Sequence, residues 1–183
     1  MMNYKEKFCP YIKNFNKVEF TESAIKKVTV FVNEIIKIKI DEPHHIIDNG
    51  SEFKRFFTGT LGEIAIEHFL KCNFFDWTIG NSNEYNQADL KKIGLNIGVK
   101  TVEYGKFPVV HKDVKRPEII NVKIDNEILI CGFASIDLLN KYQDDALILS
   151  PSLRARNVKS GFYGFEHLIQ FKSIEDLKKL SAR

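Results

Sequence analysis

The stretch from residue 118 to residue 133 constrains the fold most, because it holds two apolar runs on either side of a two-residue connection. Both runs, Glu118–Ile124 and Glu127–Phe133, are rich in the β-branched residues that favour strands. The connection Asp125–Asn126 is long enough only for a tight turn. The sequence therefore predicts an antiparallel hairpin in this stretch.

A second hairpin is predicted upstream, where the runs Ala88–Lys92 and Leu95–Val102 are separated by Ile93–Gly94. In the second run, residues alternate with period two between an apolar set and a more polar set, which is typical of a strand buried on one face. This alternation puts Lys100 on the less apolar face. A turn at residues 93–94 brings Asp89 to the same face, within one or two residues of register.

Helices are predicted from apolar residues that recur at three- and four-residue spacing and from capping residues. The expected helices are Thr21–Lys39, Ser51–Cys72 with Ser51 as its cap, Ser135–Tyr142 and Ser173–Leu180. Further short strands are expected at Trp77–Gly80 and Ala146–Leu149. In the second helix, Glu63 and Glu67 are four residues apart and therefore project from the same side.

This order of elements predicts an α/β fold in which helices flank a mixed central β-sheet. With 183 residues and no linker rich in Ser, Gly or Pro, the chain is expected to form a single domain, 1–183. A core that carries the motifs covers about residues 51–133. An N-terminal helical segment covers residues 20–42, and a basic and aromatic C-terminal segment covers residues 150–183.

The composition excludes several classes of protein. Hydrophobic residues make up 44% of the chain and charged residues 28%, which excludes intrinsic disorder. The apolar runs are far shorter than the ~20 residues needed to span a bilayer, and the N-terminus lacks the apolar block of a secretory signal. We therefore expect a cytoplasmic protein without a membrane partner. A net charge of +3 permits nucleic-acid binding without requiring it.

If Asp89 and Lys100 share one face of the sheet, a carboxylate lies beside an ammonium group. Such a pair on a half-open face can hold a hard divalent cation and help to position or deprotonate a water molecule. A plain cross-strand ion pair on a solvated face is the alternative interpretation.

Three short motifs give this pair a wider context. Gly62–Glu63–Ile64–Ala65 lies in a predicted helix, Ala88–Asp89–Leu90 in one strand and Val99–Lys100–Thr101 in the next. Over about residues 51–133, their order and spacing resemble the PD-(D/E)XK nuclease superfamily. The resemblance implies a restriction-endonuclease-like fold and hydrolysis of DNA phosphodiester bonds with Mg²⁺, for which Mn²⁺ can substitute.

The resemblance also implies roles for individual residues. Glu63 would be the helix acid, Asp89 the central metal ligand and Lys100 the residue that orients the attacking water. Together with Asp89 and Glu63, the Val99 carbonyl is an implied metal ligand. Gln87 is a candidate hydrogen-bond partner of the site.

One position departs from the family pattern, because Gly98 stands where the family usually has Asp or Glu two residues before the lysine. Three sources could supply the missing charge: Glu63 or Glu67 from the helix, Glu103 from beyond the lysine, or the Val99 carbonyl together with waters. The helix glutamates are favoured. If the site merely lacks charge, Gly98→Glu should strengthen metal binding.

Two groups of basic residues are predicted to contact double-stranded DNA through its phosphates. One lies between the motif strand and the next hairpin. The other lies in a turn-rich, aromatic segment, where arginine can read guanine edges. The residues are Lys106, Lys112, Lys115 and Arg116 in the first group and Arg154, Arg156 and Lys159 in the second.

Three hypotheses follow for the function. The first is a Mg²⁺-dependent DNA endonuclease of the type II restriction kind, acting as a homodimer to cut both strands of a symmetric site. The second is a catalytically degenerate DNA-binding member or subunit of the same fold. The third is a structural α/β module in which the motif matches are accidental.

Overall fold

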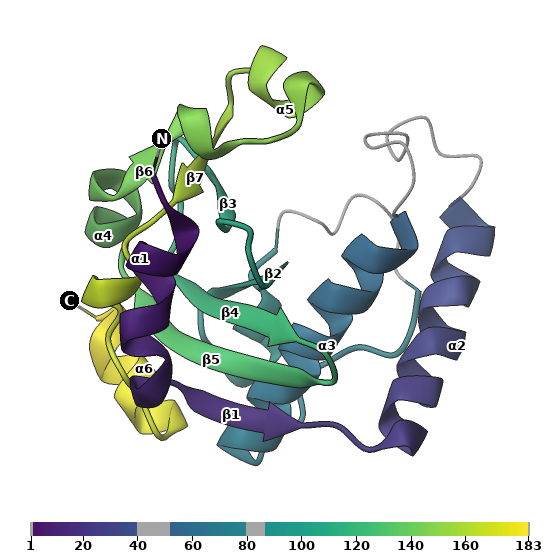
Figure 1. Cartoon of the computed structure of the whole chain (residues 1–183). Coiled ribbons are helices and arrows are strands. Elements are labelled where there is room, and N and C mark those ends of the chain that lie inside the picture. Colours follow the sequence, from purple (N-terminus) through teal and green to yellow (C-terminus); the bar gives the residue numbers. More distant parts are fainter. Residues whose placement is uncertain (1, 40–51, 80–86, 183) are drawn as a thin grey trace.

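The computed structural model describes residues 2–39, 52–79 and 87–182, and its centre is a four-stranded mixed sheet (Figure 1). The strand order is β1-β5-β4-β2, with β5 antiparallel to both of its neighbours and β2 parallel to β4. The bounds are β1 Asn16–Glu19, β2 Gly98–Glu103, β4 Glu118–Ile124 and β5 Glu127–Ala134. The predicted α/β class with a mixed sheet is therefore confirmed.

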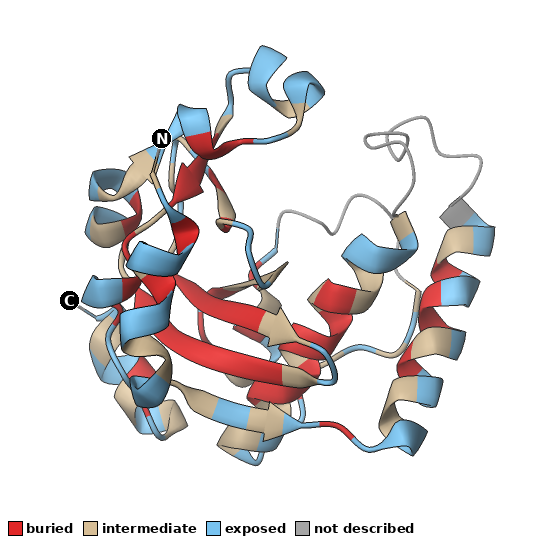
Figure 2. Ribbon diagram, viewed as in Figure 1, coloured by how far each residue is buried: buried red, intermediate tan, exposed pale blue. Residues whose placement is uncertain are grey.

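The hairpin predicted from residue 118 to residue 133 is confirmed as β4 and β5. Asp125 adopts a positive φ of 49°, a left-handed conformation that Asp tolerates better than most residues. Both strands are buried over most of their length (Figure 2). They form the rigid centre against which both layers of the molecule pack.

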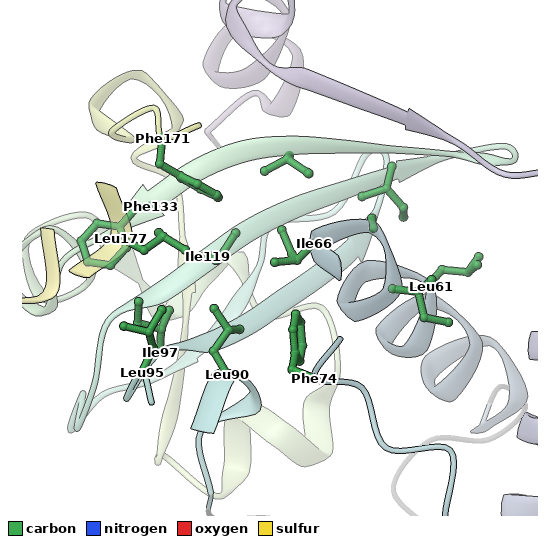
Figure 3. Close-up of a cluster of buried hydrophobic side chains, with 14 of the residues drawn as sticks. Leu61, Ile66, Phe74, Leu90, Leu95, Ile97, Ile119, Phe133, Phe171 and Leu177 are labelled. Carbon is green, nitrogen blue, oxygen red and sulfur yellow. The ribbon is translucent and has the colours of Figure 1, made fainter. Parts of the chain in front are cut away.

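Helices and one cluster of buried side chains cover one face of this sheet. The cluster joins Leu61 and Ile66 of α3 to Ile97, Ile119 and other sheet and loop residues (Figure 3). The helices that contribute to it are α2 Glu22–Lys39, α3 Glu52–Leu70 and α6 Ile174–Ser181. All three agree with predicted helices. None of the helices among the described residues is long and apolar enough to cross a membrane.

The other face of the sheet packs on a second cluster that is rich in aromatic rings, including Phe8, Phe162 and Phe165. A small antiparallel sheet of order β3-β7-β6 lies on this side. Its strands are β3 Val109–His111, β6 Gln143–Asp144 and β7 Lys159–Phe162, and the neighbouring helices are α1 Tyr4–Phe8, α4 Ile136–Lys141 and α5 Pro151–Ala155. Of these elements, the sequence predicts α4 alone.

Helix α3 lies unusually close to the edge strand β2. A Cβ atom on Gly62 would overlap the Thr101 hydroxyl, so only glycine allows this approach. The buried Asn121 amide on β4 bridges the contact by donating to the Gly62 carbonyl at 3.3 Å and to Thr101 Oγ1 at 3.4 Å. The next residue of the helix is Glu63, which is thereby fixed beside β2.

The prediction of a strand at Ala88–Lys92 is wrong. Asp89 instead begins a 3-10 helix, η3 Asp89–Ile93, whose hydrogen bonds are local and end at Gly94 in a left-handed conformation with φ 78°. The turn is where it was predicted, but the chain on its two sides does not form a hairpin. β2 begins only at Gly98 and pairs with β4 instead.

Two other short strands were also predicted wrongly. Residues 146–147 belong to a 3-10 helix, η4 Asp145–Leu147, because the side chain of Asp144 caps a turn there by accepting from the backbone of Ala146. Residues 77–79 form no strand, and Gly80 lies outside the described residues. The predicted cap Ser51 also lies outside them.

We expect Gly62→Ala to destabilise the protein by about 1–3 kcal/mol, because the added methyl group overpacks the contact with Thr101. The matched control is Gly59→Ala in the same helix, where a Cβ atom meets nothing within 4 Å. That control should stabilise the protein by up to about 1 kcal/mol through helix propensity. Urea unfolding of the two variants would contradict this packing if both changed stability in the same direction.

Candidate active site

Three of the predicted site residues converge from three different elements. Glu63 comes from α3, Asp89 from the start of η3 and Lys100 from β2. Their charges act on one another, because Asp89 raises the pKa of the Glu63 carboxyl and Lys100 lowers it. The structure therefore brings together the three residues that the motifs single out.

The backbone of β2 holds Asp89 in place. The Val99 N–H donates to Asp89 Oδ2 at 2.5 Å, directly before Lys100 in the strand. This bond, together with the bond from the Leu90 N–H to the Ile97 carbonyl at 3.1 Å, links the two segments in place of the predicted strand pairing. Val99, predicted to act through its carbonyl, thus has a positioning role through its N–H.

A fourth acidic residue, Glu118, belongs to this group. It is the first residue of β4 and the cross-strand partner of Gly98. Its side chain is 8% exposed, and Oε2 is buried without a hydrogen-bond partner among the described residues. A Cβ atom on Gly98 would overlap the Glu118 carboxyl group, so this carboxyl group fills the space next to the glycine.

The three acids share one electrostatic environment. Burial is the largest cause that raises the pKa of Glu63, of Asp89 and of Glu118 above the usual range. The Asp89 carboxylate raises the pKa of the other two further, whereas Lys100 lowers all three. The folded chain thus keeps acids together in a place where their ionised forms repel each other.

The structure places Glu67 and Glu103 in other contacts. Glu67 Oε1 accepts from the backbone N–H groups of Phe74 at 2.5 Å and Phe75 at 2.6 Å, which fixes the chain after α3. Its charge still raises the pKa of Glu63. Glu103 accepts from Thr58 Oγ1 at 2.7 Å and pairs with Lys54 and Lys123.

Glu103 therefore faces α3, and the alternation of β2 points Lys100 to the opposite face. Gln87 is exposed and accepts from the Lys91 ammonium at 3.1 Å, outside the group of acids. Neither residue supplies the charge that is missing at Gly98.

Part of the predicted basic surface borders Glu118. A pocket of about 570 Å³ has Glu118 in its wall, together with basic and polar residues of the β3–β4 connection and of the segment before β7. These residues include His111, Lys112, Lys115, Arg116 and Asn157. The carboxyl group of Glu118 and the first basic group thus share one surface depression.

The residues predicted to contact DNA differ in their interactions within the protein. Lys112 pairs with Asp145 and donates to Asn157 Oδ1 at 2.5 Å, and Lys115 pairs with Asp113. Lys106 lines a different pocket, beside Glu103. In the second basic group, Arg154 donates to the Ile148 carbonyl, and Arg156 is exposed just after α5.

Lys159 differs from these exposed residues. It lies on β7 opposite His111 of β3 and is half-buried. Burial lowers the pKa of its ammonium group, and the positive charges of Lys100, Arg55 and Arg156 lower the pKa further. The charge of Lys100 thus acts on Lys159, which belongs to the small sheet β3-β7-β6.

The chemistry of these donors fits a hard divalent cation. Carboxylate oxygens are the ligands that Mg²⁺ prefers, and a cation would relieve the repulsion among the acids and give Glu118 Oε2 a partner. Across residues 2–39, 52–79 and 87–182, no three His, Cys, Asp or Glu side chains are grouped as a metal site. Mg²⁺ commonly binds one or two carboxylates with waters and substrate phosphates, so it does not need such a group.

The chain matches no protein-family model, and comparisons with curated proteins and with solved structures found no match.

Sequence reasoning missed Glu118, although it placed this residue at the start of a strand. The available signal was an acid at the entrance of an otherwise apolar run. Its position beside Gly98 depends on the parallel pairing of β2 with β4, which joins segments that the sequence assigned to separate hairpins.

We expect the metal-free protein to lose stability as the pH rises from about 4.5 to about 8. Burial is the main cause that raises the pKa of Glu63 from its usual value of 4.5 to about 8, so the folded state binds more protons across this window. The loss in the free energy of unfolding approaches about 1.4 kcal/mol per pH unit for one group. For a chain of this size, each kcal/mol lost lowers Tm by about 2–4 °C. Glu63→Gln removes this titration.

The measurement is thermal unfolding of wild type and Glu63→Gln in EDTA at several pH values. The difference in Tm between variant and wild type should grow as the pH rises. Parallel Tm curves for the two proteins would show that the carboxyl of Glu63 is not held in the environment described.

Proposed function

We propose that this protein is a Mg²⁺-dependent endodeoxyribonuclease with a restriction-endonuclease-like fold. The observation that carries the proposal is that Glu63, Asp89 and Lys100, which come from three elements, act on one another electrostatically. Asp89 and Lys100 also act on Glu118, which lines a pocket that contains basic residues. Mn²⁺ is the expected substitute metal. The resemblance of the three motifs to PD-(D/E)XK nucleases supports the same reaction.

The residues divide the work of phosphodiester hydrolysis among them. Asp89 and Glu63 would hold the metal, and the N–H of Val99 keeps Asp89 oriented toward the site. A bound Mg²⁺ lowers the pKa of a water and neutralises charge on the phosphate. Lys100 would orient the attacking water or donate to a phosphate oxygen, and its charge lowers the pKa of all three acids.

The basic residues would bind the DNA backbone beside this centre. The pocket wall contains Lys112, Lys115 and Arg116 together with Glu118, so a strand bound there would pass Glu118. Lys159 approaches the same centre from β7. Cutting both strands of a symmetric site would require a homodimer, because each chain carries one set of these residues.

A catalytically degenerate DNA-binding protein of the same fold is the second candidate. The observation that favours it is Gly98, which removes the acid that the nuclease family usually carries before its lysine. The two candidates share the DNA-binding surface and differ in whether the acids still hold a metal.

We expect purified protein to nick supercoiled plasmid with Mg²⁺ or Mn²⁺, and Asp89→Ala and Lys100→Ala to reduce the rate by at least about 100-fold. The matched controls are Asp76→Ala and Lys92→Ala, an exposed pair at 2.6 Å outside the group of acids. These controls should cut like wild type. Equal rates in all five proteins would point to a contaminating nuclease.

We expect DNA binding in EDTA to weaken as salt increases, because Lys and Arg release counterions from the phosphates. Lys159→Ala should reduce the slope of log K against log salt by about 1. The control Lys17→Ala alters a lysine on β1 that pairs with Glu19 and Glu127, and should leave the slope unchanged. Gel shifts at several salt concentrations measure both, and a protein that neither binds nor cuts DNA would be the structural module.

A further inference from the structure

We propose that Glu118, on the neighbouring strand, supplies the carboxylate that nucleases of this kind carry two positions before the lysine. The absence of a side chain at Gly98 leaves room for the Glu118 carboxyl group. The inference rests on the proposed function, because it assigns a ligand of the same metal site. It names a residue that lies outside the three motifs.

The register of the sheet places the Glu118 side chain where an acid at position 98 would be. Gly98 and Glu118 are direct partners in the parallel pair β2–β4, so their side chains leave the sheet on the same face. Lys100, two residues after Gly98, also leaves on that face. An acid on β4 at this level therefore lies beside the lysine, as an acid at position 98 would.

The carboxyl group of Glu118 occupies the space that a side chain at position 98 would need. A Cβ atom on Gly98 would overlap the carboxyl group of Glu118, with Oε2, Cδ and Oε1 as its three nearest neighbours. Any side chain at position 98 would displace this carboxyl group. The loss of an acid at position 98 and the presence of one at position 118 are therefore two consequences of the same packing.

The burial and hydrogen bonding of the Glu118 carboxyl group indicate what it would bind. Glu118 is more than nine-tenths buried, and its Oε2 has no hydrogen-bond partner among the described residues. Burying a carboxylate without a partner is costly, so natural proteins usually pair such groups or use them to bind metals. The Asp89 carboxylate raises the pKa of Glu118 further, so the ionised forms of the two acids repel each other and a bound cation would relieve that repulsion.

This geometry changes the expected effect of adding an acid at position 98. Gly98→Glu on its own would place two carboxyl groups in one space and disturb the β2–β4 pair. Moving the acid back, with Gly98→Glu and Glu118→Ala together, would leave one carboxyl group on the same face. The metal site should then be restored only in the double variant.

The main test is calorimetric titration of Mn²⁺ into the metal-free full chain without DNA. Glu118→Gln keeps the shape of the side chain and should weaken Mn²⁺ binding at least tenfold, whereas Gly98→Glu with Glu118→Ala should recover to within about threefold of wild type. The control Glu127→Gln, on the next strand, where Glu127 pairs with Lys17, should bind like wild type. Asp89→Asn should weaken Mn²⁺ binding as strongly as Glu118→Gln.

The outcomes separate this inference from the proposed function. If Asp89→Asn loses Mn²⁺ affinity while Glu118→Gln retains it, the assignment of Glu118 is overturned and the nuclease proposal stands. If wild type does not bind Mn²⁺, both are overturned. A folded double variant that binds as weakly as Glu118→Gln would overturn the equivalence of the two positions.

A second measurement tests the packing without metal and covers the case in which the double variant does not fold. Gly98→Ala should lower the urea midpoint of the wild-type protein, and it should lower the midpoint much less in a Glu118→Ala background. Equal losses in the two backgrounds would show that Glu118 does not occupy the space beside Gly98.

Discussion

The close approach of helix α3 to strand β2 is the contact on which the site depends. β2 is an edge strand, and its outer side is available to the helix only because Gly62 has no Cβ atom to collide with Thr101. The buried Asn121 amide ties the helix carbonyl and the threonine hydroxyl to β4, so three elements are fixed at one point. Glu63 follows in the next helical position. A wider spacing would move its carboxyl group away from Asp89 and Lys100.

Strand alternation on β2 then separates charges that are close in sequence. Glu103 faces α3, where Thr58, Lys54 and Lys123 satisfy it. Lys100 faces the other way, where Glu118 has a buried oxygen with no hydrogen-bond partner in the described part of the chain. One side of the strand therefore carries compensated charges that hold the helix in place. The other side carries Lys100 and the carboxyl group of Glu118, whose repulsion by Asp89 a ligand would relieve.

Features set by local sequence could be predicted, whereas features set by distant pairing could not. The β4–β5 hairpin, four helices and the turn at Gly94 depend on residues near them in the chain, and all agree with the structure. Asp89 was placed in a strand because its neighbours suit one, but local hydrogen bonds make it the start of a 3-10 helix. The role of Glu118 depends on a parallel register between segments twenty residues apart, which no periodicity in either segment reveals.

The distribution of charge argues against a network that serves stability alone. Such a network gains stability by pairing opposite charges, as the exposed pair of Lys92 and Asp76 does at 2.6 Å. At the site, Glu118 Oε2 is buried without a hydrogen-bond partner among the described residues, and lysine and arginine charges lower the pKa of Lys159. Proteins retain arrangements that cost stability mainly where function requires them. A bound divalent cation would neutralise the charge of the acids, and a bound phosphate group would neutralise the charge of the lysines. Binding the two together would relieve the repulsion within each set.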